Sequence, residues 1–234
     1  MKLVLTCEHG GNKIPAEYLA LFVDAQEALN SHRGLDMGAL DLFYHLSKLA
    51  RFSQSNTISR LLIEINRSPD HPKLFSEYTI ELSKKEKMKL IETFYFPYRH
   101  EVKKKISELI AKGEEVLHFS VHSFTPVWKG ESRNADIGLL YDPSQAREKS
   151  FCKNFKQQLL LQSPSLKIRY NYPYLGTADG FTTYLRKEFP NKYSGIELEV
   201  NQKFTSQNIM EAGLKTSIYK TLEICLKNNK GPEN

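Results

Sequence analysis

The 234-residue chain lacks the features that mark several large classes of protein. It contains no apolar run near the roughly 20 residues that a membrane-spanning helix requires, which excludes a helical membrane protein. It has no glycine-, serine- or proline-rich linker and no internal repeat, so we expect one domain over residues 1–234. Hydrophobic residues make up 40% of the chain and aromatic residues 11%, which excludes low-complexity disorder and provides for a core.

Cysteine is also scarce. Cys7, Cys152 and Cys225 are odd in number, lie far apart in the sequence and form no CxxC pair. This spacing argues against a disulfide framework and against a structural zinc site built from cysteine pairs. We interpret the short apolar N-terminus, which Glu8 interrupts, as a first strand rather than a secretion signal. We therefore expect a cytoplasmic protein without a membrane segment.

The net charge of +6 favours anionic ligands through long-range attraction, although a solvated basic surface has the same composition. The lysine clusters at residues 84–85 and 103–105 lie in a long amphipathic stretch without interleaved aromatic residues. Nucleic acid is therefore a disfavoured partner. Nothing in the sequence indicates a particular oligomeric state.

Alternating strand-like and helix-like segments predict an α/β fold, with a mostly parallel mixed sheet flanked by helices. The apolar periodicity predicts strands over residues 2–7, 57–65, 115–121, 136–141 and 194–200. It predicts helices over residues 34–50, 83–112 with a kink or break at Pro97, 145–162, 180–189 and 206–227. The polar residues 228–234 are expected to form a frayed tail.

Two histidines stand at the ends of apolar strands. His9 follows the first strand and His122 follows the strand over residues 115–121. Ligands of open α/β sheets bind at the carboxyl ends of the strands, so we expect both imidazoles at one site. A catalytic zinc ion needs three protein ligands, and imidazole is a common one. Either histidine alone is also compatible with a hydrogen-bonded residue at the core edge, but the pair favours a metal site.

The third ligand is open at this point. Asp36, at the start of the predicted helix 34–50, is one candidate, and its alternative role is to stabilise the helix dipole. Glu8 is a second candidate, but adjacent strand residues point to opposite faces, which disfavours joint binding with His9. The remaining histidines compete less well, although His32 is close enough to Asp36 to support it; the others are His45, His71, His100 and His118.

Asn66 and Arg67 follow the apolar run at residues 61–65. An arginine fork beside an amide is suited to capture of a carboxylate, and the alternative is a surface arginine that closes a strand. Two weaker candidates for the same role are Arg60 and Arg133.

A late strand supplies a candidate general base. Glu197 and Glu199 share one face of the predicted strand 194–200, because side chains alternate with a period of two. A carboxylate there is suited to accept a proton from water beside a metal ion, and the pattern does not choose between the two.

Several short motifs follow one another along the chain. The most specific is Val121–Pro126, followed by Arg133 and Asp136–Gly138. The others are Cys7–Pro15, His32–Ala39, Ser59–Leu61, Glu64–Arg67 and Pro97–Tyr98. Together they resemble the N-formylglutamate amidohydrolase family, from about residue 3 to about residue 204.

The resemblance implies a phosphorylase/hydrolase-like α/β fold, which this family shares with the zinc carboxypeptidases, and zinc-dependent hydrolysis of N-acyl amino acids. His9 and His122 match the histidine ligands, and Asp36 matches the acidic position of the pattern H-x-x-x-D-x-G-A. The carboxylate-binding pair and the late acid are matched by Asn66, Arg67 and Glu199, the last better than Glu197.

The resemblance also implies roles outside this set. Tyr98, in the Pro97–Tyr98 motif, becomes a candidate substrate-binding residue, beside Arg60. Arg133 becomes a candidate catalytic residue that stabilises the oxyanion or binds a second carboxylate. The expected substrate is a small N-acyl amino acid with a carboxylate, similar to N-formylglutamate.

Three positions depart from the family pattern. Asn12 stands where the carboxypeptidases have an acidic ligand, Glu64 where the family often has aspartate, and Arg99 where it has histidine. Because of Asn12, the third ligand stays open among Asp36, Glu8 and Asn12 itself. The alternatives in function are a carboxypeptidase-like hydrolase of another acidic or peptide substrate and a non-catalytic carboxylate-binding relative.

Overall fold

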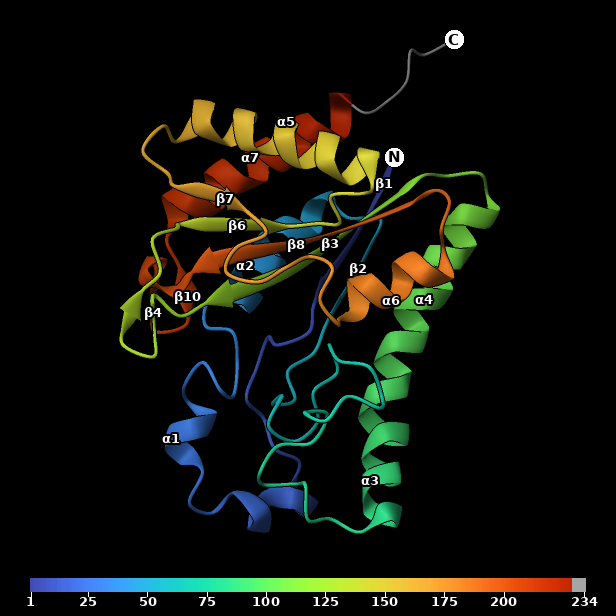
Figure 1. Cartoon of the computed structure of the whole chain (residues 1–234), viewed down its shortest axis with the longest axis vertical. Coiled ribbons are helices and arrows are strands. Elements are labelled where there is room, and N and C mark those ends of the chain that lie inside the picture. Colours follow the sequence, from blue (N-terminus) through green and yellow to red (C-terminus); the bar gives the residue numbers. More distant parts are fainter. Residues whose placement is uncertain (229–234) are drawn as a thin grey trace.

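A computed structural model describes residues 1–228 of the chain, and buried, largely apolar strands build its central sheet. Of the predicted tail over residues 228–234, all but the first residue lie outside this range. The sheet has six strands in the order β2-β1-β3-β8-β6-β7 (Figure 1). These are β1 (Lys2–Cys7), β2 (Phe52–Ser55), β3 (Val116–Phe124), β6 (Ile137–Leu140), β7 (Ile168–Tyr170) and β8 (Tyr193–Asn201).

Four strands, β2, β1, β3 and β8, run parallel to one another, and β6 pairs antiparallel with β8. The last strand, β7, is parallel to β6. The predicted α/β fold with a mostly parallel mixed sheet is therefore confirmed. Two short hairpins stand apart from the sheet: β4 (Val127–Trp128) with β5 (Glu131–Ser132), and β9 (Thr205–Ser206) with β10 (Ile209–Met210).

Helices cover both faces of the sheet. On one face, α2 (Ala39–Leu46), α5 (Ala146–Gln162) and α7 (Ala212–Asn228) pack against alternate residues of the strands, such as Leu5, Phe119 and Leu198. On the other face, α4 (Phe96–Ala111) and α6 (Phe181–Glu188) pack against Val4 and Val116. The remaining short helices are η1 (Ala16–Phe22), α1 (Gln26–Leu29), η2 (Ser47–Leu49) and η4 (Gln202–Phe204).

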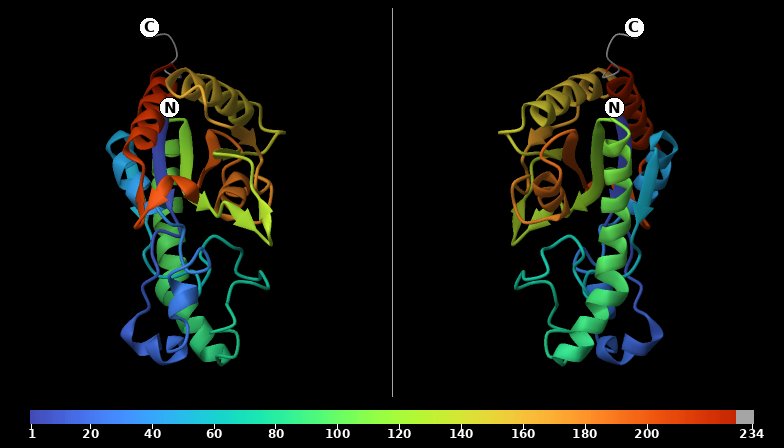
Figure 2. Two further views of the ribbon diagram at one scale, coloured as in Figure 1. Left: turned by 90° about the vertical axis from the view of Figure 1, so that its left-hand side faces the viewer. Right: turned by 90° about the vertical axis from the view of Figure 1, so that its right-hand side faces the viewer.

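The longest helical run joins α3 (Lys84–Leu90), a π-helical segment η3 (Ile91–Tyr95) and α4 along one side of the molecule (Figure 2). A capping box between Ser83 and Glu86 begins it. Pro97 has no N–H to donate, and the preceding turn widens so that the Phe96 N–H bonds the Ile91 carbonyl. The predicted helix over 83–112 is confirmed, and the chain passes Pro97 through a π turn rather than a break.

The predicted strand over residues 57–65 is wrong. The strand in this region is β2, and residues 57–65 form turns, apart from a single bridge between Ile58 and Lys13. The Leu62 N–H bonds the Ser59 carbonyl, which coils the backbone. The apolar side chains that follow pack into the same core as α4. A short apolar run can be buried in a loop as well as in a strand, so periodicity alone does not distinguish them.

Three element boundaries also differ from the prediction. The helix predicted from residue 34 begins at Ala39, because Gly38 has a left-handed φ of 77° that an α-helix does not accept. The helix predicted from residue 206 begins at Ala212, after the β9–β10 hairpin. The strand predicted over 115–121 extends to Phe124, so His122 lies within β3 rather than after it.

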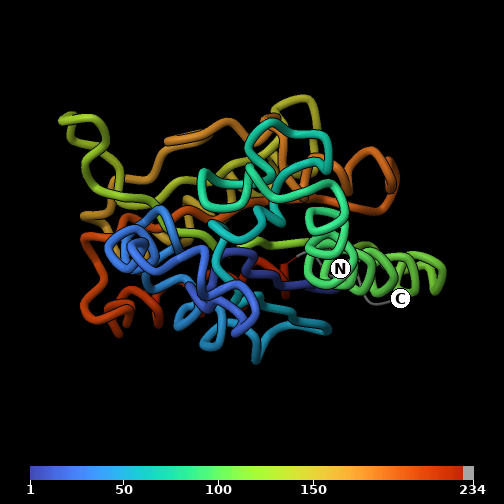
Figure 3. The backbone as a smooth tube through the Cα atoms, turned by 90° about the horizontal axis from the view of Figure 1, so that it is seen from below, coloured from blue at the N-terminus to red at the C-terminus, as the bar shows by residue number. Residues whose placement is uncertain are grey.

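Two irregular segments, residues 8–38 and 56–83, lie side by side below the sheet (Figures 1 and 3). Backbone bonds join them, from the Lys13 N–H to the Thr57 carbonyl and from the Ser59 N–H to the Lys13 carbonyl. The first segment continues β1 beyond its carboxyl end, where ligands of parallel sheets bind. Within residues 1–228, no helix combines the length and the hydropathy needed to cross a bilayer.

Candidate metal-binding active site

The register of the sheet gathers polar side chains on one face. In the parallel pairing of β3 with β8, Ser120 lies opposite Glu197, and His122 lies opposite Glu199. Their apolar neighbours in sequence alternate to the other face and enter the core with α2, α5 and α7. The face that carries α4 and α6 therefore receives one histidine and two carboxylates near the carboxyl ends of its strands.

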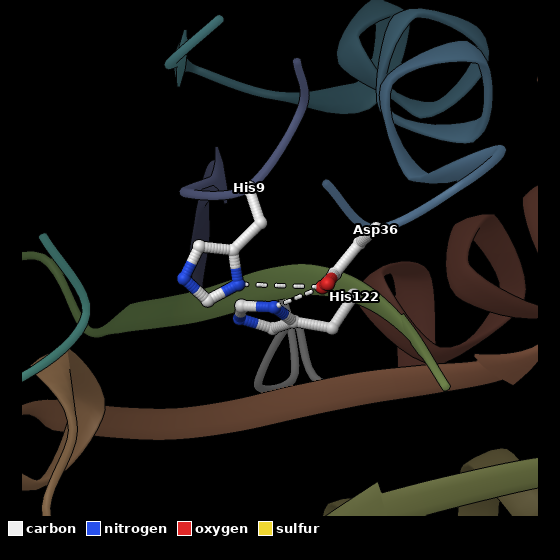
Figure 4. A group of neighbouring side chains, drawn as sticks. All are labelled: His9, Asp36 and His122. Atoms are coloured by element: carbon white, nitrogen blue, oxygen red, sulfur yellow. Dashed lines mark hydrogen bonds and ion pairs between the residues drawn. The ribbon is translucent and has the colours of Figure 1, made fainter. Parts of the chain in front are cut away.

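A cluster of three side chains lies next to this face of the sheet and consists of His9, Asp36 and His122 (Figure 4). Their closest ligand atoms all lie within 4.8 Å of one another, and the three residues are buried. Asp36 Oδ2 lies 2.9 Å from His122 Nδ1 and 3.4 Å from His9 Nδ1. Both imidazoles therefore turn the same nitrogen, Nδ1, toward one carboxylate oxygen.

A tight turn before α2 delivers Asp36. The Asp36 N–H bonds the His9 carbonyl at 2.9 Å, which fixes the two residues side by side. Gly34 allows the turn, because a Cβ there would lie 2.2 Å from the Leu29 carbonyl oxygen. Asp36 precedes the helix by three residues, so it does not serve as the helix-opening carboxylate that the sequence allowed.

Two further carboxylates hold the outer nitrogens of the histidines. His9 Nε2 donates to Glu64 Oε1 at 2.5 Å. His122 Nε2 donates to Ser120 Oγ at 2.9 Å, and that hydroxyl donates to Glu8 Oε2 at 2.5 Å. A partner on the outer nitrogen fixes the tautomer and leaves Nδ1 as the lone-pair donor, an arrangement typical of metal-binding histidines.

The donor set fits a zinc ion. Two imidazole nitrogens and one carboxylate oxygen are ligands that catalytic zinc uses. Ligand atoms on a tetrahedral zinc, each about 2.0–2.1 Å from the metal, lie roughly 3.3 Å apart, close to the 3.4 Å between His9 Nδ1 and Asp36 Oδ2. The other two candidates for the third ligand point elsewhere. Glu8 serves the outer side of His122, and the Asn12 amide donates to the Leu29 carbonyl and to Asn30.

Electrostatics in this cluster follow from the alternation of imidazole and carboxylate. Burial alone would raise the pKa of Glu8, but the hydrogen bond and charge of His122 lower it to about 2. The pKa of Asp36 also falls well below its ordinary value, because the two histidines outweigh burial. Burial opposes a charged His122, yet its bonds to Asp36 and Glu8 raise its pKa well above the ordinary value.

Glu199 differs from the other carboxylates. It is 4% exposed, and its Oε2 has no hydrogen-bond partner in the described residues. Burial raises its pKa to about 8, an effect that His122 opposes and Asp36 reinforces. Glu197, two residues earlier, is half-buried and accepts a bond from the Thr182 hydroxyl at 2.5 Å. Both acids line the cavity, and Glu199 alone presents a buried oxygen without a partner.

A cavity of about 180 Å³ opens over these groups. Its wall includes Asn66 and Arg67, as well as Arg60, Tyr174 and Asp179. Its volume lies below the roughly 300–1,000 Å³ typical of pockets for drug-sized ligands, which indicates a ligand of amino-acid size.

The predicted carboxylate-binding pair lies in this wall with part of its hydrogen-bonding capacity free. Asn66 Oδ1 accepts from the Phe181 N–H at 2.8 Å, so the amide NH₂ is its remaining donor end. Arg67 donates one N–H to the Asp179 carbonyl at 2.5 Å. A planar guanidinium has five such donors, so most of the fork faces the cavity or solvent.

Two predicted site residues lie outside the cavity wall. Tyr98 is buried below the site, where its hydroxyl donates to Glu8 at 3.1 Å. The guanidinium of Arg133 stacks near the mouth, between 5.3 and 5.8 Å from the ring centroids of Phe124, Trp128 and Tyr174.

Arg60, another predicted substrate-binding residue, lines the cavity, but its guanidinium already bonds two carboxylates. It donates to Glu64 at 2.7 Å and to Asp36 at 3.4 Å. Of the remaining histidines, His32 reaches the cavity, and His118 is a core residue that bonds Thr6 and Tyr193.

Sequence reasoning missed the roles of four residues in or beside the site. Glu64 was recognised only as a departure from a family pattern, and its bond to His9 joins residues 55 positions apart. Asp179 and Tyr174, which line the cavity, carry no local signal at all. Arg99 is buried beside the site, where it donates to the Ile65 and Arg67 carbonyls.

Comparison with known proteins gives a family and a fold. The sequence profile of the family described as N-formylglutamate amidohydrolase matches residues 1–205. Among curated proteins, no sequence matches the chain.

Two solved structures are similar over nearly the full length. A gene product from Agrobacterium tumefaciens has a TM-score of 0.81 and 24% identity, over 98% of this chain and 92% of that one. An N-formylglutamate amidohydrolase from Ralstonia eutropha has a TM-score of 0.72 and 16% identity, over 97% of this chain and 93% of that one. At these identities the likeness shows the fold.

Proposed function

The chain belongs to the N-formylglutamate amidohydrolase family, a family of hydrolases that act on amides, and we propose that it uses Zn²⁺ to cleave N-acyl amino acids. The observation that carries this proposal is the pair of carboxylate-supported imidazoles around Asp36, beside the unpartnered oxygen of Glu199. A binding protein for carboxylates needs no such group, whereas hydrolysis of an amide needs a base for water.

His9, Asp36 and His122 would hold the metal ion. When bound there, Zn²⁺ supplies Lewis-acid polarisation of the amide carbonyl and lowers the pKa of water. Glu8 and Glu64 keep the two imidazoles in the tautomer and orientation that present Nδ1.

Glu199 is the proposed general base, and the alternative Glu197 is less suited because the Thr182 hydroxyl occupies one of its oxygens. Glu199 Oε2 accepts the proton of the attacking water and delivers it to the leaving amine. Burial raises its pKa to about 8 in the metal-free protein, and a nearby dication favours the carboxylate.

Arg67 and the Asn66 amide NH₂ are the proposed clamp for the substrate carboxylate. A bidentate arginine fixes orientation as well as affinity, so the acyl group is placed over the metal-binding cluster. The cavity volume of about 180 Å³ favours an N-acyl amino acid over a peptide. Arg60 contributes by holding Glu64 and Asp36, and contact with substrate stays a prediction for it and for Arg133.

Elemental analysis tests the metal site. Protein purified without a polyhistidine tag should carry close to one zinc per chain, and His122→Ala should lose it together with turnover. Activity that persists without any metal would contradict the proposal. No zinc in either protein, even after zinc addition, would leave only a carboxylate-binding pocket.

A substrate panel tests the clamp. Zinc-loaded protein should hydrolyse N-acyl amino acids, starting from N-formylglutamate. Arg67→Ala should raise KM and leave zinc content intact. Loss of zinc in Arg67→Ala would show that the residue supports the metal site instead.

We also propose that the protein acts in the cytoplasm. Its three cysteines, Cys7, Cys152 and Cys225, are buried thiols in the described structure, which suits a reducing compartment. Cell fractionation with an antibody to the native chain tests this location, and recovery in a secreted or periplasmic fraction would contradict it.

A further inference from the structure

Once the proposed roles are assigned, the cavity wall has two acids without a role and no unassigned arginine or lysine. Two cationic side chains, Arg60 and Arg67, line it. Arg60 is occupied by Glu64 and Asp36, and Arg67 is reserved for the substrate α-carboxylate. Among the described residues that line the cavity, no arginine or lysine is left to receive a second carboxylate.

The wall carries two acids beyond the metal cluster and the base. Asp179 is held in place by the N–H and hydroxyl of Ser68, and its charge faces the same cavity. Glu197 is less constrained, because its one hydrogen bond comes from the Thr182 hydroxyl. No ion pair within residues 1–228 includes Glu197. Its charge interacts with that of Arg186, but the Arg186 guanidinium is ion-paired with Glu148 at 2.8 Å.

Glu197 also stands next to the proposed carboxylate clamp. A Cβ placed on Gly180 would lie 3.5 Å from Glu197 Oε1 and 3.6 Å from Asn66 Oδ1, so the two side chains flank the same point. Glycine leaves that point open. The side chain of an amino acid branches from the carbon that bears its carboxylate, so a carboxylate held by Asn66 and Arg67 brings the side chain close to Glu197.

We propose that Glu197 selects the side chain of the substrate, favouring N-acyl amino acids with a cationic or hydrogen-bond-donating side chain over those with a second carboxylate. The inference rests on the proposed function for the position of the α-carboxylate. A glutamate side chain would place its own charge against Glu197, and the described cavity wall has no unassigned arginine or lysine to receive it. A lysine or glutamine side chain would donate to the free oxygen of Glu197.

Calorimetric titration of metal-free protein measures this selection without turnover. The probes are Nα-acetyl-lysine, Nα-acetyl-glutamine and N-acetylglutamate. The native protein should bind the lysine probe at least about tenfold more tightly than the glutamate probe, because like charges at close range are strongly unfavourable. Glu197→Gln keeps the shape and still accepts the Thr182 bond. It should weaken the lysine probe about tenfold, strengthen the glutamate probe and change the glutamine probe by less than about threefold.

The control variant is Glu81→Gln, which removes the same charge from an exposed position outside the cavity wall. It should bind all three probes as the native protein does. Equal or tighter binding of the glutamate probe by the native protein would overturn the selection, and so would an unchanged preference in Glu197→Gln. Failure of all three probes to bind, with or without zinc, would overturn the inference together with the clamp on which it rests.

Hydrolysis of the matching N-formyl compounds by zinc-loaded protein separates the two proposals. The expected binding preference without hydrolysis would refute the enzyme and leave the role of Glu197 in place. Hydrolysis that favours N-formylglutamate would support the enzyme and refute the role of Glu197.

Discussion

Zinc binding should release close to two protons per metal ion at pH 7. A metal ligand must give up its proton, and Asp36 has none to lose because its pKa lies far below neutrality. His122 is protonated in the metal-free protein, since Asp36 and Glu8 raise its pKa well above the ordinary value. It therefore releases one proton when Nδ1 binds a metal.

The second proton comes from Glu199. With a pKa of about 8, about nine-tenths of the Glu199 carboxyl groups are protonated at pH 7. A dication beside this group favours the charged form, so its proton leaves as well. Protons compete with zinc below these pKa values, so the affinity of the protein for zinc falls as the pH falls. The logarithm of Kd should drop by nearly two for each unit of rising pH around pH 7.

Calorimetric titration of zinc in three buffers of different ionisation enthalpy counts the protons. Glu199→Gln has no proton to lose there and should release about one fewer than the native protein. The difference isolates Glu199, because protons from every other source are counted in both proteins. Equal counts would refute the titration of Glu199 with the metal. A native count near zero would refute the protonated His122 and its role as ligand.

Three further changes test the supporting structure. Glu64→Gln weakens the partner of His9 and should lower zinc affinity about 10- to 100-fold in a chelator competition; affinity within threefold would contradict that role. Arg99→Lys loses the planar guanidinium that fixes the carbonyl of Arg67, so KM should rise about tenfold at constant zinc content, with kcat nearly unchanged. Metal loss in that variant would instead indicate general disruption. Phe155→Ala empties a fully buried core position and should cost about 3–5 kcal/mol of unfolding free energy in urea titrations, with native kcat/KM.

Local patterns in the sequence determined much of the scaffold. A short apolar run in residues 2–7 and alternation in residues 194–200 predict two strands that the structure contains, with Glu197 and Glu199 on one face. Period-3.6 patterns likewise predict α5 and α6 within a residue of their observed ends. Such predictions succeed because side-chain direction in a strand or helix depends on position along that element alone.

The same reasoning failed where the backbone does not repeat. Residues 57–65 have the composition of a buried strand, yet turns stabilised by side-chain and backbone bonds hold them in a loop. The start of the helix after Asp36 depends on the left-handed conformation of Gly38. That shift of a few residues turns Asp36 from a helix-capping group into a member of the histidine cluster.

The sequence by itself indicated that His9, His122 and a late glutamate belong to one site, because each stands near the end of a predicted strand, and it offered Asp36 as one of three candidates for the third ligand. Tertiary structure alone decided how they relate. The pairing of β3 with β8 sets Glu199 beside His122, and two loops carry Glu64 to His9 across 55 residues. Strand order, register and loop packing arise from burial summed over the whole core, and no local pattern encodes them.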